Sequence, residues 1–143
     1  MLANEREKLI RLAAFLDGEG FIRVQYYKRK AGFTVSPIVR IVNTNMKLIK
    51  WLITTFGGSY HVQKRYSSLH KLGLVWSANQ AYNLLEKLLP FLILKKEQAE
   101  IALKIRDICP QIKWQKGWTE SKIQQFNFYY QQIAALNKKG TSV

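Results

Sequence analysis

The chain has 143 residues, enough for one domain with a buried core, and a formal net charge of +14, which favours a polyanionic partner, nucleic acid ahead of a membrane surface. No apolar run approaches the ~20 residues of a membrane span, and the charged N-terminus lacks a secretory signal pattern. The only cysteine, Cys109, excludes an internal disulfide and a cysteine-based metal site, so we expect an intracellular protein. From the length we expect residues 1–143 to form a single domain.

The first predicted element is a helix that begins at Asn4, whose spacing from Glu7 is typical of an N-cap pair. Gly18 and Gly20 are expected to end it. From Leu9 onward the helix is apolar on nearly every side, so we expect it to be buried against other elements.

Asp17 and Glu19 stand at the carboxyl end of this helix, where the helix dipole disfavours a carboxylate by up to about 1 kcal/mol. Local conflicts of this kind are candidates for functional sites. A hard cation such as Mg²⁺ would remove the conflict, because carboxylate and backbone carbonyl oxygens are its preferred ligands. The alternative is that these are ordinary turn residues, and the spacing alone leaves both interpretations open.

Two hairpins and several helices follow. Period-two alternation predicts a strand over 22–29, a turn at 30–32 and a second strand over 33–43, in which Pro37 indicates an edge position or a bulge. Asn45, Asn79 and Thr119 are predicted to cap later helices. The remaining elements are strands over 59–66 and 71–77 and helices over 45–56, 79–89, 95–109 and from 119 onward.

This order, helix, hairpin, helix, hairpin and then helices, predicts an α+β fold of αββαββαα type with one antiparallel four-stranded sheet and helices on one face. The open face is expected to present long polar and basic side chains: Arg23, Gln25, Tyr27, Arg29, Arg40, His61, Gln63, Arg65 and Lys71. Such side chains on a β-ribbon are suited to reading base edges in a DNA groove.

The distribution of charge supports this interpretation. Nothing between Gly20 and Leu85 is acidic, whereas the same stretch contains ten lysines and arginines. An ordinary solvated sheet face is the alternative. A long central region without any acid favours a phosphate-facing surface instead.

The stretch Leu12-Ala13-Ala14-Phe15-Leu16-Asp17-Gly18-Glu19-Gly20 resembles the LAGLIDADG motif of the homing endonucleases. The run Leu89-Pro90-Phe91-Leu92-Ile93-Leu94-Lys95-Lys96-Glu97-Gln98-Ala99 is similar to the P-F-L-x-x-K-x-x-Q-A run of the single-motif members. The resemblance covers nearly the whole chain and implies a saddle-shaped sheet and a metal-dependent DNA endonuclease.

The resemblance also implies roles for single residues. Glu19 would bind Mg²⁺ or Mn²⁺ with help from the Gly18 carbonyl, Lys95 would stabilise transition-state charge, and Asn43 would position the attacking water. A single motif implies a homodimer that cuts a long near-palindromic DNA target, because a duplex needs one site per strand. The dimer contacts would come from one stretch of the motif helix: Leu12, Ala13, Ala14, Leu16 and Asp17, with Ala13 and Ala14 allowing close packing and Asp17 tying the helices together.

The chain departs from the family pattern in three places. Glu19 replaces the more usual Asp, Ala14 stands where Gly is common, and Asn43 where Gln is common. Lys95 also fits a solvated lysine at a helix start. An RNA-binding maturase that assists intron splicing therefore stays an alternative, and a transcription regulator is a third. The resemblance suits an intron reading frame in an archaeal cytoplasm or in an organelle such as a chloroplast or mitochondrion.

Overall fold

The computed structural model describes residues 3–29, 32–63, 71–108 and 119–139. Its first element is helix α1 (Ala3–Glu19), followed without a gap by strand β1 (Gly20–Arg29). The prediction of Asn4 as N-cap is wrong, because the helix already includes Ala3. Gly18 does not end the helix either, since α1 continues through Glu19.

Gly20 makes the change from helix to strand sterically possible. A Cβ atom at this position would collide with the Leu16 side chain and lie 2.8 Å from the Arg40 carbonyl oxygen. Only glycine allows this close approach of α1, β1 and the neighbouring strand. At Gly18, by contrast, a Cβ atom would meet nothing within 4 Å.

The described strands form one antiparallel sheet in the order β1-β2-β4-β3, which confirms the predicted four-stranded sheet. Strand β2 (Gly32–Asn43) pairs with β1 from Gly20↔Ile41 to Arg29↔Gly32. Strands β3 (Ser59–Gln63) and β4 (Lys71–Ser77) form the second hairpin.

Pro37 lies where β2 has a single neighbour. Among the described residues, β4 pairs with β2 only from Ile38 to Asn43, so the part of β2 before Ile38 has β1 on one side and no described strand paired on the other. The predicted edge position is therefore confirmed locally, although β2 as a whole is an interior strand.

In the described part of the chain, three α-helices follow the second hairpin, which agrees with the helices predicted over 79–89, 95–109 and from 119 onward, whereas the αββαββαα order counts only two. Among the described residues, β4 leads to α3, a short 3-10 helix η1, α4 and α5, because Pro90 separates α3 from the extended residue Leu92 before α4 begins. The bounds of the helices are α2 (Met46–Phe56), α3 (Ala78–Leu88), η1 (Leu89–Phe91), α4 (Lys96–Ile108) and α5 (Glu120–Lys139).

Two of the predicted caps are confirmed. The Asn45 side chain accepts a hydrogen bond from the Lys47 N–H at 2.9 Å, and the Thr119 hydroxyl accepts one from the Lys122 N–H at 3.3 Å. The prediction for Asn79 is wrong, because α3 begins one residue earlier.

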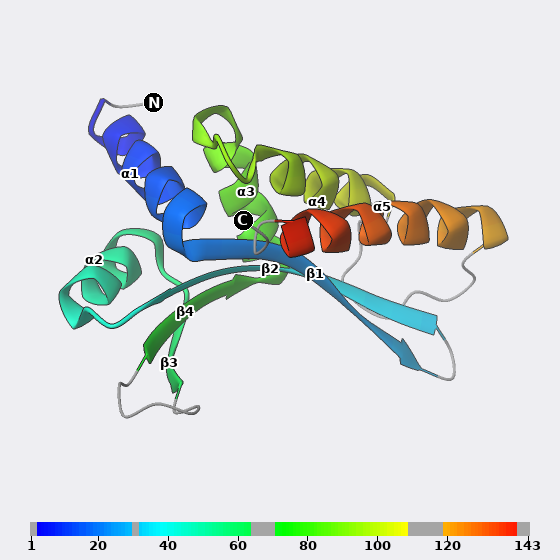
Figure 1. The fold of residues 1–143 in the computed structure, drawn as a ribbon, viewed down its shortest axis with the longest axis horizontal. Helices are drawn as coiled ribbons and strands as arrows, with labels where there is room; N and C mark the ends of the chain where they lie inside the picture. Colours follow the sequence, from blue (N-terminus) through cyan, green and yellow to red (C-terminus); the bar gives the residue numbers. More distant parts are fainter. Residues whose placement is uncertain (1–2, 30–31, 64–70, 109–118, 140–143) are drawn as a thin grey trace.

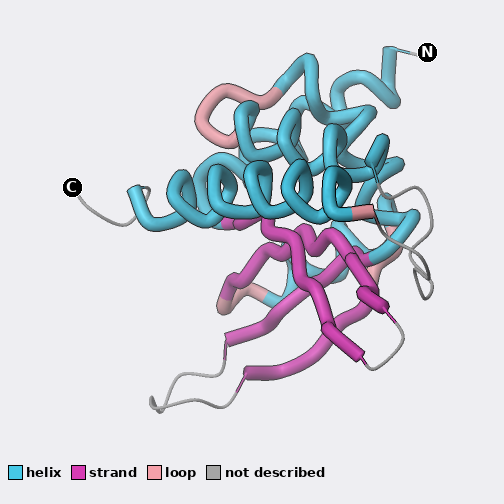
Figure 2. The backbone as a smooth tube through the Cα atoms, turned by 90° about the vertical axis from the view of Figure 1, so that its right-hand side faces the viewer, coloured by secondary structure: helices cyan, strands magenta, loops and turns pink. Residues whose placement is uncertain are grey.

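The molecule has a helical layer on one face of a curved sheet. Figure 1 shows the strands as an arch, with α1, α3, α4 and α5 above its convex side and the concave side open. Figure 2 confirms the separation of helices and strands into two layers. The sheet side chains that face the helices are fully or almost fully buried: Ile22, Val24, Val35, Val39, Ile41 and Trp76. Burial of this set leaves the opposite, concave face for a ligand.

Within the described ranges, none of the helices has the length and apolar character needed to cross a membrane.

Candidate nucleic-acid interface and active site

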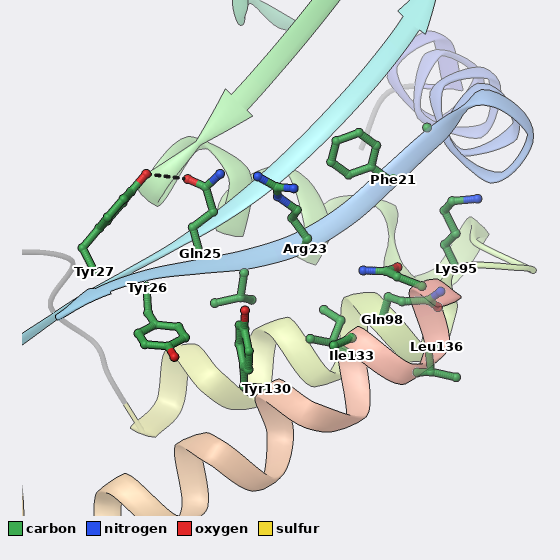
Figure 3. Close-up of a pocket in the computed structure, with 14 residues that line it drawn as sticks. Phe21, Arg23, Gln25, Tyr26, Tyr27, Lys95, Gln98, Tyr130, Ile133 and Leu136 are labelled. Atoms are coloured by element: carbon green, nitrogen blue, oxygen red, sulfur yellow. Dashed lines mark hydrogen bonds between the residues drawn. The ribbon is translucent and has the colours of Figure 1, made fainter. Parts of the chain in front are cut away.

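The concave face of the sheet collects the polar positions of β1. Figure 3 shows Phe21, Arg23, Gln25 and Tyr27 projecting from one side of the strand, while Tyr26 points to the other side, toward α5. The Tyr27 hydroxyl donates a hydrogen bond to Gln25 Oε1 at 3.1 Å, and both side chains remain accessible. The alternation that the sequence predicted for this strand therefore places donors and acceptors on the open face.

Strand β2 adds further groups to this face. Arg40 pairs with Phe21 and Ser36 pairs with Gln25, so all four positions share one side of the sheet. Thr34 lies two residues before Ser36 on the same side. The sequence analysis missed Phe21, Thr34 and Ser36. Each is an even number of residues from a predicted position on its own strand, Arg23 for Phe21 and Arg40 for the other two, and this spacing indicates the same face of the sheet.

Arg40 occupies an electrostatically unfavourable place. It is partly buried next to Arg23 on the same face. Burial, and then the positive charge of Arg23, lower the pKa of Arg40 from its ordinary value. The site thus concentrates positive charge on the open face.

The register places four more of the predicted positions on this face: Arg29, His61, Gln63 and Lys71. His61 pairs with Gly73, which pairs with Val42, two residues from Arg40. Arg65, the last predicted member, lies outside the described residues.

Glu19 and Asn43 come together at the junction of α1 and the sheet. Asn43 Nδ2 donates a hydrogen bond to Glu19 Oε2 at 2.5 Å, although the residues are 24 positions apart. The Asn43 amide is itself oriented, because its Oδ1 accepts a hydrogen bond from the Asn45 N–H at 2.7 Å. The Glu19 side chain is exposed. The two residues that the family resemblance selected thus form one accessible, oriented pair.

Asp17 has a different role from the one predicted. Its carboxylate accepts backbone hydrogen bonds from Ile93, Leu94 and Lys95 at 2.8, 3.1 and 3.0 Å, at the approach to α4. Asp17 therefore ties the end of α1 to α4 within one chain, which corrects the expectation that it joins two motif helices. These N–H donors also offset the unfavourable helix dipole.

Lys95 completes this connection in the reverse direction. Its ammonium group donates a hydrogen bond to the Asp17 carbonyl at 2.9 Å, at the carboxyl end of α1. Lys95 also lines a groove of about 680 Å³ together with Gly20 and Arg23. Lys95 thus lies at the α1–β1 junction, where Glu19 ends α1 (Figure 3).

The donor set at this junction fits a hard divalent cation only in part. Glu19 offers an exposed carboxylate, and the last carbonyls of α1 around Gly18 are oxygen donors of the same kind. Mg²⁺ is commonly held by one or two carboxylates together with substrate phosphates and water. No group of three or more His, Cys, Asp or Glu side chains suited to a metal occurs in the described part of the chain, so the protein alone supplies an incomplete shell.

The exposed face of α1 differs from the predicted dimer contact. Three of the five predicted residues are fully buried in the core of their own chain: Leu12, Ala13 and Leu16. They cannot reach a second chain, because the apolar stripe of α1 that packs on β2 and α3 contains them. The accessible stripe is Ile10, which is 44% exposed, Ala14 and Gly18, at helical spacing of four residues.

No protein-family model and no curated protein sequence matches the chain. The homing endonuclease I-CvuI, solved in complex with its target in the presence of 2 mM Ca, matches with a TM-score of 0.73 and 23% identity, over 93% of this chain and 83% of that chain. The archaeal intron-encoded homing endonuclease I-Vdi141I, complexed with DNA, matches with a TM-score of 0.72 and 16% identity, over 92% of this chain and 85% of that chain.

A longer protein of similar fold matches over part of its length. The LAGLIDADG homing endonuclease I-LtrWI, bound to target DNA, has a TM-score of 0.63 and 20% identity, and the match covers 85% of this chain but 42% of that chain. These likenesses confirm the fold: the chain has the fold of the LAGLIDADG homing endonucleases, as the motif resemblance predicted.

Proposed function

We propose that this chain is a site-specific DNA endonuclease of the homing type, which binds double-stranded DNA on the concave face of its sheet and hydrolyses it with divalent metal ions. The observation that carries the proposal is the placing of the Glu19–Asn43 pair at the end of a basic, open sheet face. A duplex lying along Arg23, Gln25 and Arg40 would bring its backbone to that pair. Intron-encoded origin is part of the proposal, by analogy with I-Vdi141I.

The residues at the junction divide the chemistry among them. A divalent cation, when bound, would activate water and neutralise phosphoryl charge. Glu19 would be its protein ligand, and the 2.5 Å bond from Asn43 holds the carboxylate in place. Lys95 would add positive charge where the leaving oxygen becomes negative, after releasing the Asp17 carbonyl that it now contacts.

A homodimer is part of the same proposal. Cleavage of both strands needs two junctions of this kind, and one chain has one motif. The match over less than half of I-LtrWI is consistent with a protein that supplies half of a full binding surface. The stripe of Ile10, Ala14 and Gly18 would pack against the same stripe of a second copy. Beside it lies an apolar groove lined by Arg11, Ala14, Phe15, Leu48 and Trp51, which the second copy would cover.

The decisive experiment is cleavage of a randomised duplex library by wild type and Glu19→Gln, first with Mg²⁺ and then with Ca²⁺. Glu86→Gln is a matched control, because Glu86 contacts Arg106 at 3.3 Å on the helical layer. We expect wild type and the control to cut one long near-palindrome only with Mg²⁺. We expect Glu19→Gln to bind that sequence without cutting it.

The opposite outcome is equally informative. If no variant cuts any duplex, yet wild type and Glu19→Gln both bind structured RNA tightly, the maturase alternative replaces the endonuclease. Light scattering of the free protein tests the homodimer separately, since a monomer at micromolar concentration would contradict it.

A further inference from the structure

One aromatic ring on the concave face contacts two positive charges. The guanidinium carbon of Arg23 lies 5.8 Å from the centroid of the Phe21 ring, and that of Arg40 lies 5.7 Å from the same centroid. The register explains the arrangement, because Phe21 pairs directly with Arg40 and precedes Arg23 by two residues on the same strand face. We call Arg23, Phe21 and Arg40 the Arg–Phe–Arg cluster.

Two positive charges lie close together in this cluster, an arrangement that is suited to a ligand with hydrogen-bond acceptors. Two like charges lie on neighbouring positions, and no acidic residue occurs between Gly20 and Leu85 in the sequence. Burial, and then the neighbouring charge of Arg23, lower the pKa of Arg40. A ligand rich in hydrogen-bond acceptors would relieve the repulsion, and the Phe21 ring limits the freedom of both guanidinium groups before binding.

The position of Arg40 favours base edges over phosphates, and Arg23 lies beside it on the neighbouring edge strand β1. Arg40 is on the interior strand β2, paired with β1 on one side and β4 on the other. A sheet that enters a DNA groove directs its central side chains at base edges, whereas the phosphates flank it. Among base edges, the O6 and N7 acceptors of guanine match the planar fork of arginine.

We infer that the Arg–Phe–Arg cluster reads two guanines in each half-site, in the part of the target next to the Glu19–Asn43 pair, and that Phe21 is the positioning residue that sets this preference. The inference rests on the proposed function, because it assumes that duplex DNA occupies the concave face. The inference goes beyond the proposed function by naming the bases and the residue that arranges the two arginines.

The test combines target selection with an altered base. Wild type, Phe21→Leu and Phe128→Leu would each select from a randomised duplex library in Ca²⁺. Phe128 is the control, because it is an exposed phenylalanine on α5, away from the sheet face. The selected guanines would then be replaced one at a time by 7-deazaguanine, which removes the N7 acceptor but keeps base pairing and phosphates.

We expect wild type and Phe128→Leu to prefer guanine at two positions of each half-site. They should lose about 5-fold in affinity at each 7-deazaguanine, the lower end of the range for a bidentate base contact, because O6 still accepts one of the two hydrogen bonds. Phe21→Leu should lose discrimination at both positions together while keeping its thermal stability within a few degrees. A shared loss at two positions is not expected of a residue with only a packing role.

Three results would overturn the inference, and they are distinguishable. Specific binding with unchanged guanine preference in Phe21→Leu would show that Phe21 does not position the arginines. Full tolerance of 7-deazaguanine by wild type would show that the arginines do not bind the N7 acceptors. Either result would leave the proposed function intact. If wild type selects no duplex sequence at all, the proposed function fails and the inference fails with it.

Discussion

The Asp17 carboxylate offers the most direct test of how the candidate site is held together. Oδ1 accepts the N–H groups of Leu94 and Lys95, and Oδ2 accepts that of Ile93. In Asp17→Asn one oxygen becomes an amide nitrogen, which cannot accept, so at least one of the three N–H groups loses its partner. We expect the free energy of unfolding to fall by about 1–2 kcal/mol, the upper part of the range for loss of a helix N-cap.

Thermal unfolding followed by circular dichroism measures this loss. For a domain of this size each kcal/mol corresponds to roughly 2–4 °C in Tm. The expected decrease for Asp17→Asn is therefore about 2–8 °C. Asp107→Asn is the matched control, because Asp107 is an exposed aspartate that pairs with Arg106 at 3.7 Å on the surface of the helical layer. We expect the control to melt with the wild type.

A melting temperature for Asp17→Asn equal to that of Asp107→Asn would refute this reasoning. It would mean that water satisfies the three N–H groups as well as the carboxylate does. Asp17 would then contribute nothing to the joining of α1 and α4, and the position of Lys95 would need another explanation.

Three further predictions concern the junction and the exposed stripe of α1. Gly20→Ala should lower the free energy of unfolding by about 1–3 kcal/mol, because its Cβ atom collides with backbone. Gly18→Ala should raise that of the monomer by about 0.5–1 kcal/mol, because its Cβ atom meets nothing and alanine favours the helix. Chemical denaturation measures both changes. Asn43→Ala should slow cleavage about 10- to 100-fold with little change in DNA affinity, because it frees the Glu19 carboxylate; equal losses in binding and cleavage would contradict this. Ala14→Arg should yield a folded monomer in light scattering, and an intact dimer would place the interface elsewhere.

Most of the fold was predictable because its signals are local. Period-two alternation placed β1 and β2, and Asn45 and Thr119 marked the starts of their helices by side-chain capping. The errors fall where local signals compete with packing. Asn4 and Asn79 were expected to cap helices, yet α1 and α3 each begin one residue before them.

Three of the five residues predicted for the dimer contact were wrong for a physical reason. A helix that is apolar on nearly every side does not reveal which side its own core covers. Leu12, Ala13 and Leu16 turned out to be fully buried within the chain, and the exposed stripe contains the smaller residues Ala14 and Gly18. Distinguishing the two stripes required the position of the sheet and of α3, which no spacing along α1 contains.

The two acids at the end of α1 show how one local conflict can have two solutions. Asp17 and Glu19 both oppose the helix dipole, and a single metal site was the simplest explanation for both. Asp17 is instead satisfied by three N–H groups that come 76 or more residues later in the chain. Glu19 remains exposed, held by one amide that is itself held by the backbone. In the folded chain, Glu19 is therefore the carboxylate that still opposes the helix dipole. Because the protein orients this carboxylate without neutralising its charge, Glu19 is a better candidate than Asp17 for a ligand of a metal ion.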